Sequence, residues 1–241
     1  MSDFDFDRFK VELFEGLSAA ADSVSTAAQD MTSDVKRYKR FAETGRDLFL
    51  SGLITSHGGN MSETDGTSIW ITRTGAMLGR VTPGNIVETA WGADASGRDA
   101  EASMELVVHR AIYQALAASE NGDLAKSFKV ADTAGEMRAA IIHAHPAHTV
   151  ARSLVDAEIC PPDSEGKLLL GESVSVIAPK EAVASVEAAE KMAELVGMGA
   201  CIAVVAGHGP FAVAPSLEEA YKLISCLERS AEIASILGTK I

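Results

Sequence analysis

The 241-residue sequence predicts one α/β domain organised in three layers. Three observations support this class. Helical periodicity and short strand-like apolar segments are mixed along the chain. The length lies within the range of a single compact domain that buries most of its apolar surface. Neither a fixed-period repeat nor a low-complexity linker divides the sequence, so no domain boundary is visible inside it.

Two helices are predicted to open the fold. From about Phe6 to Ala28 the apolar residues recur with helical spacing, and a second periodic stretch runs from Val35 to Ser51. The segment from Gly52 to Gly66 is rich in Gly, Ser, Thr and Asn, which predicts a loop. It leads into Ser68–Thr72, where polar and apolar residues alternate as in a strand.

The remaining chain continues the mixture of helices and strands. A helical pattern over Glu101–Ala118 is broken near residue 121, and the apolar run Ala139–Ile142 predicts a short buried strand that leads into His143. Further strands are predicted at Val174–Ile177, Ile202–Val205 and Phe211–Val213, with helices at Glu181–Val196 and Leu217–Leu237.

Composition argues against several classes of partner. The chain has 21 Lys+Arg against 34 Asp+Glu, a net charge of −13, which repels nucleic-acid backbones and anionic lipid. Its longest apolar run, Ala200–Val205, is far shorter than the roughly 20 residues of a membrane span. The acidic first residues are unlike a targeting peptide, so we expect a cytoplasmic protein. Three widely spaced cysteines fit reduced core thiols: Cys160, Cys201 and Cys226.

Three histidines form a candidate metal site. His143 and His145 are two residues apart at the end of a predicted strand, which places both imidazoles on one face. His208 lies between two glycines after another apolar strand, where the chain can approach a site closely. Three imidazoles with an open position are usual for catalytic zinc. The alternative is that they are core histidines satisfied by backbone partners.

Two other histidines are not assigned as ligands. His148 is expected on the helix after Pro146, and His109 on the helix near residue 105. Imidazoles in such positions usually lie on the surface or support the ligands.

Glu105 is a candidate general acid/base. It lies at a predicted helix start, where a carboxylate can also simply cap the helix. The apolar segment that follows would raise its pKa by desolvation, towards the range that proton transfer requires. Nearby, the segments Gly58–Ser62 and Thr72–Gly75 offer backbone N–H groups, an amide and hydroxyls that could bind an anion, although each is an ordinary turn in isolation.

Taken in order, these motifs resemble the class II aldolase and adducin family. The pattern runs Gly-Asn-x-Ser, Thr-x-Thr-Gly, Ser-x-Glu, His-x-His and a late His-Gly, over residues 45–236. The resemblance implies an α/β/α fold around a mostly antiparallel sheet, in one domain over residues 1–241 with a longer helical extension at about 1–34. It also implies a homotetramer with Zn²⁺ bound by three histidines at a subunit boundary.

The resemblance also assigns roles to individual residues. The implied roles are metal ligation by His143, His145 and His208, acid/base catalysis by Glu105, and phosphate binding by Gly59, Asn60, Thr74, Gly75 and Ser103. Met104 stands where sugar-phosphate aldolases commonly have a second serine. Between Ile159 and Glu172 there is no tyrosine to match the proton donor of these aldolases.

The function that the resemblance implies is retro-aldol cleavage of a ketose 1-phosphate, such as L-fuculose 1-phosphate, to dihydroxyacetone phosphate and an aldehyde. Other family reactions through an enediolate stay open, namely 4-epimerisation of a pentulose phosphate, decarboxylation and dehydration. Glu105, where the epimerases tend to carry Asp, favours the aldolase. A non-catalytic adducin-like binding module is a third possibility, and an all-β cupin is opposed by the long helical patterns.

Overall fold

The computed structural model describes residues 33–92, 97–118 and 138–238. The chain divides into two compact units, residues 1–40 and 41–241. In the first unit the described residues, 33–40, are helical. The helix predicted at Phe6–Ala28 lies outside the described residues. The second unit begins with helical residues 41–50 and contains every strand of the described chain.

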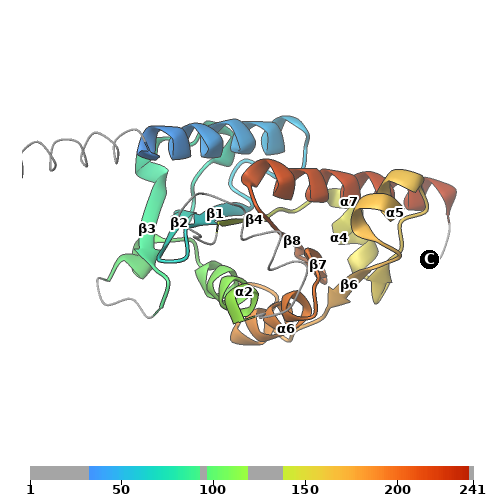
Figure 1. Cartoon of the computed structure of the whole chain (residues 1–241). Helices are drawn as coiled ribbons and strands as arrows, with labels where there is room; N and C mark the ends of the chain where they lie inside the picture. The colour runs from blue at the N-terminus through green and yellow to red at the C-terminus, as the bar shows by residue number, and fades with distance from the viewer. Residues whose placement is uncertain (1–32, 93–96, 119–137, 239–241) are drawn as a thin grey trace, which may run out of the picture. The chain divides into compact units, whose positions relative to one another are not determined.

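A single mixed sheet forms the middle layer of the second unit (Figure 1). In the described chain its strand order is β3-β2-β1-β4-β8-β7-β6-β5. Only β6 and β7 run parallel, and all other neighbours are antiparallel. The mostly antiparallel sheet is thus confirmed. The strands are β1 (Asn60–Thr64), β2 (Ser68–Thr72), β3 (Ile86–Ala90), β4 (Ala139–His143), β5 (Glu158–Ile159), β6 (Val174–Ile177), β7 (Ile202–Val205) and β8 (Gly209–Ala214).

Helices cover both faces of this sheet, which confirms the three-layer α/β/α class (Figure 1). On one side α2 (Leu106–Ala118) packs against α6 (Val186–Gly197). On the other, α7 (Leu217–Leu237) lies over β4 and β8 and packs against α4 (Ala147–Ser153) and α5 (Ser164–Leu170). Short 3₁₀ turns occupy Leu78–Arg80, Pro83–Asn85 and Arg98–Glu101.

The core on the α2 and α6 side follows from strand alternation. Ile69, Ile71, Ile141 and Val213 point to this face of their strands and pack against apolar residues of both helices. His143 is two residues beyond Ile141, so it belongs to the same face. The apolar core therefore ends where the candidate metal site begins.

Several boundaries differ from the sequence predictions. The loop predicted over Gly52–Gly66 is wrong in its second half, because residues 60–64 form β1 between β2 and β4. This strand is polar yet buried, and its side chains find hydrogen-bond partners inside the fold. Strands β3 and β5 were not predicted. Helices α2 and α6 begin about five residues later in the sequence than predicted, at Leu106 and Val186. Helix α6 begins there because the Ser185 side chain caps it.

Within the described residues, every helix is too short or too polar to cross a membrane.

Candidate metal centre and active site

The three candidate ligands come from two neighbouring strand ends. His143 is the last residue of β4, and His145 follows two residues later, with its backbone N–H donating to the Leu53 carbonyl at 3.0 Å. His208 occupies the turn between β7 and β8, where its N–H donates to Val205 at 3.0 Å. Because β8 pairs with both β4 and β7, the sheet itself brings the two ends together.

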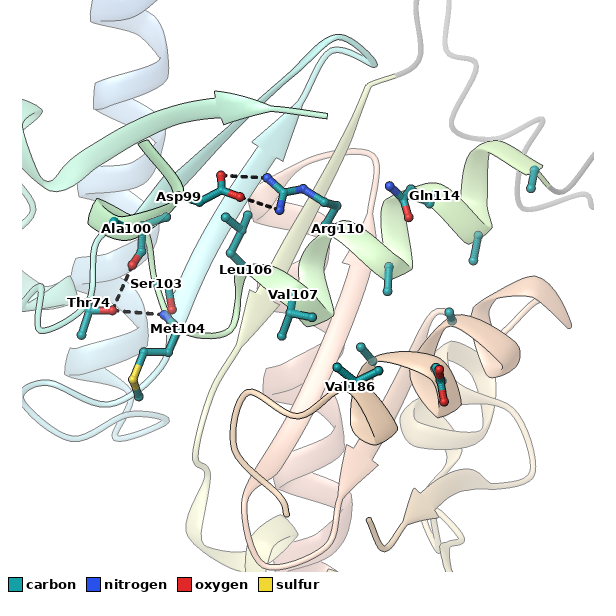
Figure 2. Close-up of a pocket in the computed structure, with 17 residues that line it drawn as sticks. Thr74, Asp99, Ala100, Ser103, Met104, Leu106, Val107, Arg110, Gln114 and Val186 are labelled. Atoms are coloured by element: carbon teal, nitrogen blue, oxygen red, sulfur yellow. Dashed lines mark hydrogen bonds and ion pairs between the residues drawn. The ribbon is translucent and has the colours of Figure 1, made fainter. Parts of the chain in front are cut away.

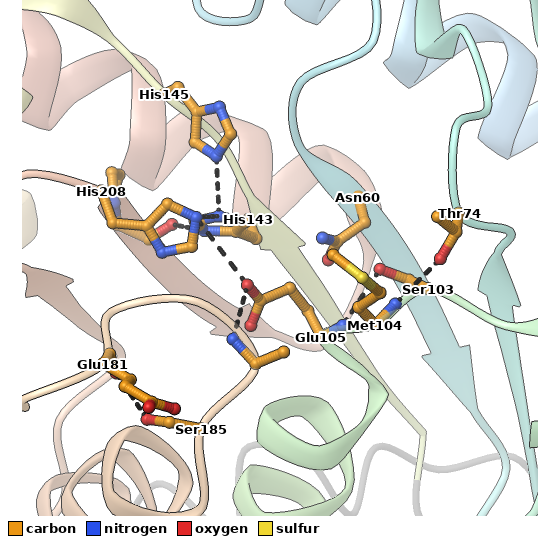
Figure 3. Close-up of polar contacts among 12 residues, drawn as sticks. Asn60, Thr74, Ser103, Met104, Glu105, His143, His145, Glu181, Ser185 and His208 are labelled. Atoms are coloured by element: carbon orange, nitrogen blue, oxygen red, sulfur yellow. Dashed lines mark hydrogen bonds and ion pairs between the residues drawn. The ribbon is translucent and has the colours of Figure 1, made fainter.

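The imidazole nitrogens converge on one point (Figure 3). The Nε2 atom of His143 lies 2.9 Å from Nε2 of His145 and 3.2 Å from Nε2 of His208. One nitrogen from each ring lies within 4.8 Å of the others. We call these three residues the histidine cluster. It is a donor set of the size and kind that divalent transition metals take in proteins.

The surroundings of His143 fix which nitrogen is available. Its Nδ1 lies 3.0 Å from the Pro210 carbonyl oxygen, which can only accept, so Nδ1 carries the proton. The Nε2 lone pair then points at the other two rings. The imidazole also stacks on Phe211, with ring centroids 4.0 Å apart and an interplanar angle of 14°. Both contacts hold the ring in the orientation that a ligand requires.

All three rings are held in the neutral form. Burial, together with the neighbouring imidazoles of His208 and His145, lowers the pKa of His143 well below its usual value. Burial and then His208 lower the pKa of His145 to about 4, and burial also lowers the pKa of His208. Neutral imidazoles have the free lone pairs that metal binding needs, so the residues present fit a divalent ion.

Two glycines allow the chain to pack tightly around this cluster. A Cβ on Gly209, at φ 151°, would lie 2.1 Å from the Ala144 carbonyl oxygen, and one on Gly59, at φ 79°, would lie 2.7 Å from the His143 carbonyl oxygen. No other residue fits either position without moving the backbone that carries the histidines. In this structure Gly59 thus has a packing role beside its proposed phosphate role.

Glu105 lies next to the histidine cluster, just before α2. One carboxylate oxygen, Oε1, is 3.7 Å from Nε2 of His208 and accepts the backbone N–H of Ala184 at 3.1 Å. The other, Oε2, is buried without a hydrogen-bond partner in the described chain. Burial raises the pKa of Glu105 to about 7, and the Ala184 N–H opposes the rise. A buried carboxyl with one free oxygen is suited to proton transfer near neutral pH.

Three polar side chains lie on the other side of Glu105 in Figure 3, and we call them the anion-side group: Asn60, Thr74 and Ser103. They differ in the donors they have left. Thr74 donates its hydroxyl to the Ala102 carbonyl at 3.0 Å and accepts the Met104 N–H at 3.1 Å. Within the described part of the chain Ser103 only accepts, from the Glu105 N–H at 3.3 Å, so its hydroxyl proton stays available. Gly75, at φ 74°, turns the chain next to Thr74.

An open pocket of about 860 Å³ adjoins this group, between α2 and α6 (Figure 2). Thr74, Ser103 and the exposed Met104 line one end, and small apolar residues of the two helices line most of the remainder. The ion pair of Arg110 with Asp99, at 2.8 Å, forms part of the wall. The histidine cluster does not line this pocket. The pocket therefore adjoins the anion-side group and not the histidine cluster.

Sequence reasoning missed the groups behind Asn60. His109, expected near the surface or as support, is fully buried, and its Nε2 lies 2.6 Å from the Asn60 side-chain oxygen. Its Nδ1 lies 2.7 Å from the Ser62 hydroxyl, which is 2.7 Å from the Tyr113 hydroxyl. A signal was present: Glu105, His109 and Tyr113 are four residues apart and so share one helix face. Among the described residues, the cluster of potential metal ligands contains neither His109 nor His148.

Comparison with known proteins identifies the family. The model of the class II aldolase and adducin N-terminal domain matches residues 39–235. The chain belongs to the class II aldolase and adducin family. The crystal structure of L-fuculose-1-phosphate aldolase from Thermus thermophilus is 33% identical to it, with a TM-score of 0.67, covering 83% of this chain and 93% of that one. No curated protein sequence gives a significant match.

More distant family structures share the fold. YgbL from Klebsiella pneumoniae, described as a putative aldolase/epimerase/decarboxylase, is 24% identical with a TM-score of 0.66, covering 86% of this chain and 92% of that one. A sugar-phosphate aldolase from Thermotoga maritima is 18% identical with a TM-score of 0.64, covering 88% and 99%. These likenesses extend over nearly the whole described chain and support the fold class alone.

Proposed function

We propose that this chain is a metal-dependent aldolase that cleaves a ketose 1-phosphate, of the L-fuculose 1-phosphate kind, into dihydroxyacetone phosphate and an aldehyde. One observation carries the proposal. Glu105 lies between the histidine cluster and the anion-side group: its carboxylate is 3.7 Å from Nε2 of His208, and its backbone N–H donates to the Ser103 hydroxyl. The similarity to the Thermus L-fuculose-1-phosphate aldolase supports the substrate class.

The residues that would hold the metal are His143, His145 and His208. Zn²⁺ is the ion that a site of three imidazoles with an open position usually takes. When bound, it would supply the positive charge that polarises the substrate carbonyl group. The proton on Nδ1 of His143, shared with the Pro210 carbonyl, would keep the lone pair of Nε2 directed at the ion.

The proton transfer is assigned to Glu105. In the cleavage direction the bond between C3 and C4 breaks, its electron pair stays on C3, and the C4 hydroxyl loses its proton to solvent water as the aldehyde forms. Glu105 then gives a proton to C3, and in the aldol direction it removes that proton. Its raised pKa of about 7 lets one carboxyl serve both directions at neutral pH.

The anion-side group is assigned to the phosphate. Ser103 and Asn60 would donate to its oxygens, and backbone N–H groups near Gly59 and Gly75 would add donors without positive charge. Binding the phosphate at a distance from the reacting carbons would fix them next to Glu105, which lowers the entropic part of the barrier.

We also propose that the working protein is a homotetramer, and light scattering of the purified protein tests this.

A substrate screen tests the function. The zinc-loaded full-length chain is incubated with several ketose 1-phosphates, and dihydroxyacetone phosphate is detected by a coupled reductase. We expect release from at least one ketose 1-phosphate and loss of release after chelation. A protein with one metal per chain that releases none, or that instead epimerises a pentulose phosphate, would overturn the aldolase proposal. Parallel metal analysis shows whether the site was loaded.

A further inference from the structure

A buried chain of hydrogen bonds leads away from the candidate phosphate site. It joins four side chains: Asn60, His109, Ser62 and Tyr113. Three of them are fully buried, and Asn60 is 6% exposed. Their separations of 2.6, 2.7 and 2.7 Å are those of strong hydrogen bonds. None of the four side chains belongs to the histidine cluster, and the proposed reaction gives a role to Asn60 alone among them.

The direction of each bond follows from the chemistry of the groups. The Asn60 oxygen only accepts, so Nε2 of His109 must carry a proton. Burial lowers the pKa of His109 to about 3, which leaves the imidazole neutral with a single N–H. Its Nδ1 must then accept from the Ser62 hydroxyl, and Ser62 in turn accepts from Tyr113. Each proton in this series of hydrogen bonds is therefore assigned to a single donor atom.

The consequence lies at the Asn60 end. With its oxygen bonded to His109, the Asn60 amide turns its NH₂ group away from the helix, and that nitrogen has no partner within the described residues. Asn60 is paired with His143 across β1 and β4, so its backbone is fixed beside the metal end of the site. Rotating the amide by 180° would break the bond to His109 and present an oxygen where an anion binds.

We propose that His109 is a positioning residue that locks the Asn60 amide with its NH₂ group towards the anionic group of the substrate. This inference rests on the proposed function for the identity of the anion, a phosphate ester. Ser62 and Tyr113 set the tautomer of His109 and so act on the Asn60 amide indirectly. A neutral, buried imidazole does this without adding a charge that would hold the product phosphate too tightly.

Inorganic phosphate is the probe, because it binds independently of aldolase turnover. Its dissociation constant is measured by calorimetry on zinc-loaded full-length variants. We expect His109→Phe, which fills the space but cannot donate, to weaken phosphate binding about tenfold or more. His109→Gln has an amide that can donate to Asn60 and accept from Ser62, so it should restore the affinity to within about threefold. Tyr221→Phe, which removes a hydroxyl bonded to Ser51 at the surface, is the matched control.

Kinetics separate positioning from a merely structural role. If cleavage is measurable, His109→Phe should raise KM for the phosphorylated ketose about tenfold and leave an unphosphorylated analogue within about twofold. Equal losses on both substrates, or equal phosphate affinity in the Phe and Gln variants, would overturn the inference. Should His109→Phe fail to fold, Ser62→Ala serves instead, since it frees the tautomer and should weaken phosphate a few-fold; unchanged affinity there also overturns it.

The two proposals fail in different ways. If Asn60→Ala and His109→Phe both weaken phosphate binding while no ketose 1-phosphate is cleaved, the positioning role stands and the aldolase proposal falls. If dihydroxyacetone phosphate is released normally and neither substitution changes the phosphate dissociation constant, the aldolase proposal stands and the positioning role falls.

Discussion

The histidine cluster and the anion-side group are the two ends of the candidate site, and they are built in different ways. The three imidazoles each direct one nitrogen at the others, and the hydrogen bond that supports His143 uses its second nitrogen. The two anion-side hydroxyls differ, since Thr74 donates its proton to a backbone carbonyl, whereas Ser103 accepts from the Glu105 N–H and, within the described residues, keeps its proton free. Residue type therefore suffices to indicate a candidate metal site, whereas a candidate anion site depends on which donors the fold leaves free.

The largest expected effect is at the metal end. His145→Ala should lower bound metal at least tenfold and remove turnover, because two remaining imidazoles bind a divalent ion far more weakly. The fold should persist, since His145 is only partly buried and a catalytic metal does not supply the folding energy. Metal content by mass spectrometry and thermal melting check this. His148→Ala is the control: it removes an imidazole bonded to Glu228, outside the cluster, and should keep the metal.

Glu105 lies between the two ends, so its substitution should slow proton transfer and leave both metal binding and phosphate binding unchanged. Glu105→Gln keeps the size and an oxygen for the Ala184 N–H but cannot carry a proton. We expect kcat to fall on the order of 10² or more, with metal content and phosphate affinity unchanged. Glu101→Gln, at an exposed carboxylate paired with Arg73, is the matched control and should be neutral. Near-normal turnover in Glu105→Gln would return that residue to a capping role.

The same contrast explains what the sequence could predict. His143 ends strand β4 and His145 follows two residues later, so a local rule sufficed to predict that both imidazoles share one face. The element types of most long segments also followed from periodicity. Strand β1 could not be predicted from periodicity, because Asn60, Ser62 and Thr64 are residue types that are common in loops. In the fold their side chains form hydrogen bonds with His109 and with the Ser68 carbonyl. His109 is 49 residues from Asn60 and 47 from Ser62, so no local pattern contains this partner.

A third prediction sharpens the anion end. Ser103→Ala should lower kcat/KM for a phosphorylated substrate roughly tenfold or more, and much less for an unphosphorylated analogue, because only the former uses the free hydroxyl. Thr74→Val, which removes a hydroxyl already donated to Ala102, should change both substrates alike and mainly lower stability. Steady-state kinetics on the two substrates decide. If Thr74→Val shows the phosphate-specific loss and Ser103→Ala does not, the assignment of free donors is reversed.

The smallest effect concerns the backbone that holds Glu105 between the two ends. Ala184 has φ 51°, and among the described residues it is the only one other than glycine with a positive φ. This conformation is unfavourable for an L-residue, and it points the Ala184 N–H at the Glu105 carboxylate at 3.1 Å.

Ala184→Gly removes the clash of the Cβ and keeps the N–H, at the cost of a more flexible unfolded chain. The net result should be a gain of about 0.5–1 kcal/mol in the free energy of unfolding. Ala178→Gly, at an exposed position of the same loop with ordinary φ, should instead lose a similar amount. Denaturant midpoints measure both. Turnover should stay within about twofold in Ala184→Gly, because the Glu105 hydrogen bond is retained. If the protein is stabilised but kcat falls tenfold, the strained residue does more than hold a bond: its rigidity would be what keeps Glu105 aligned between the histidine cluster and the anion-side group.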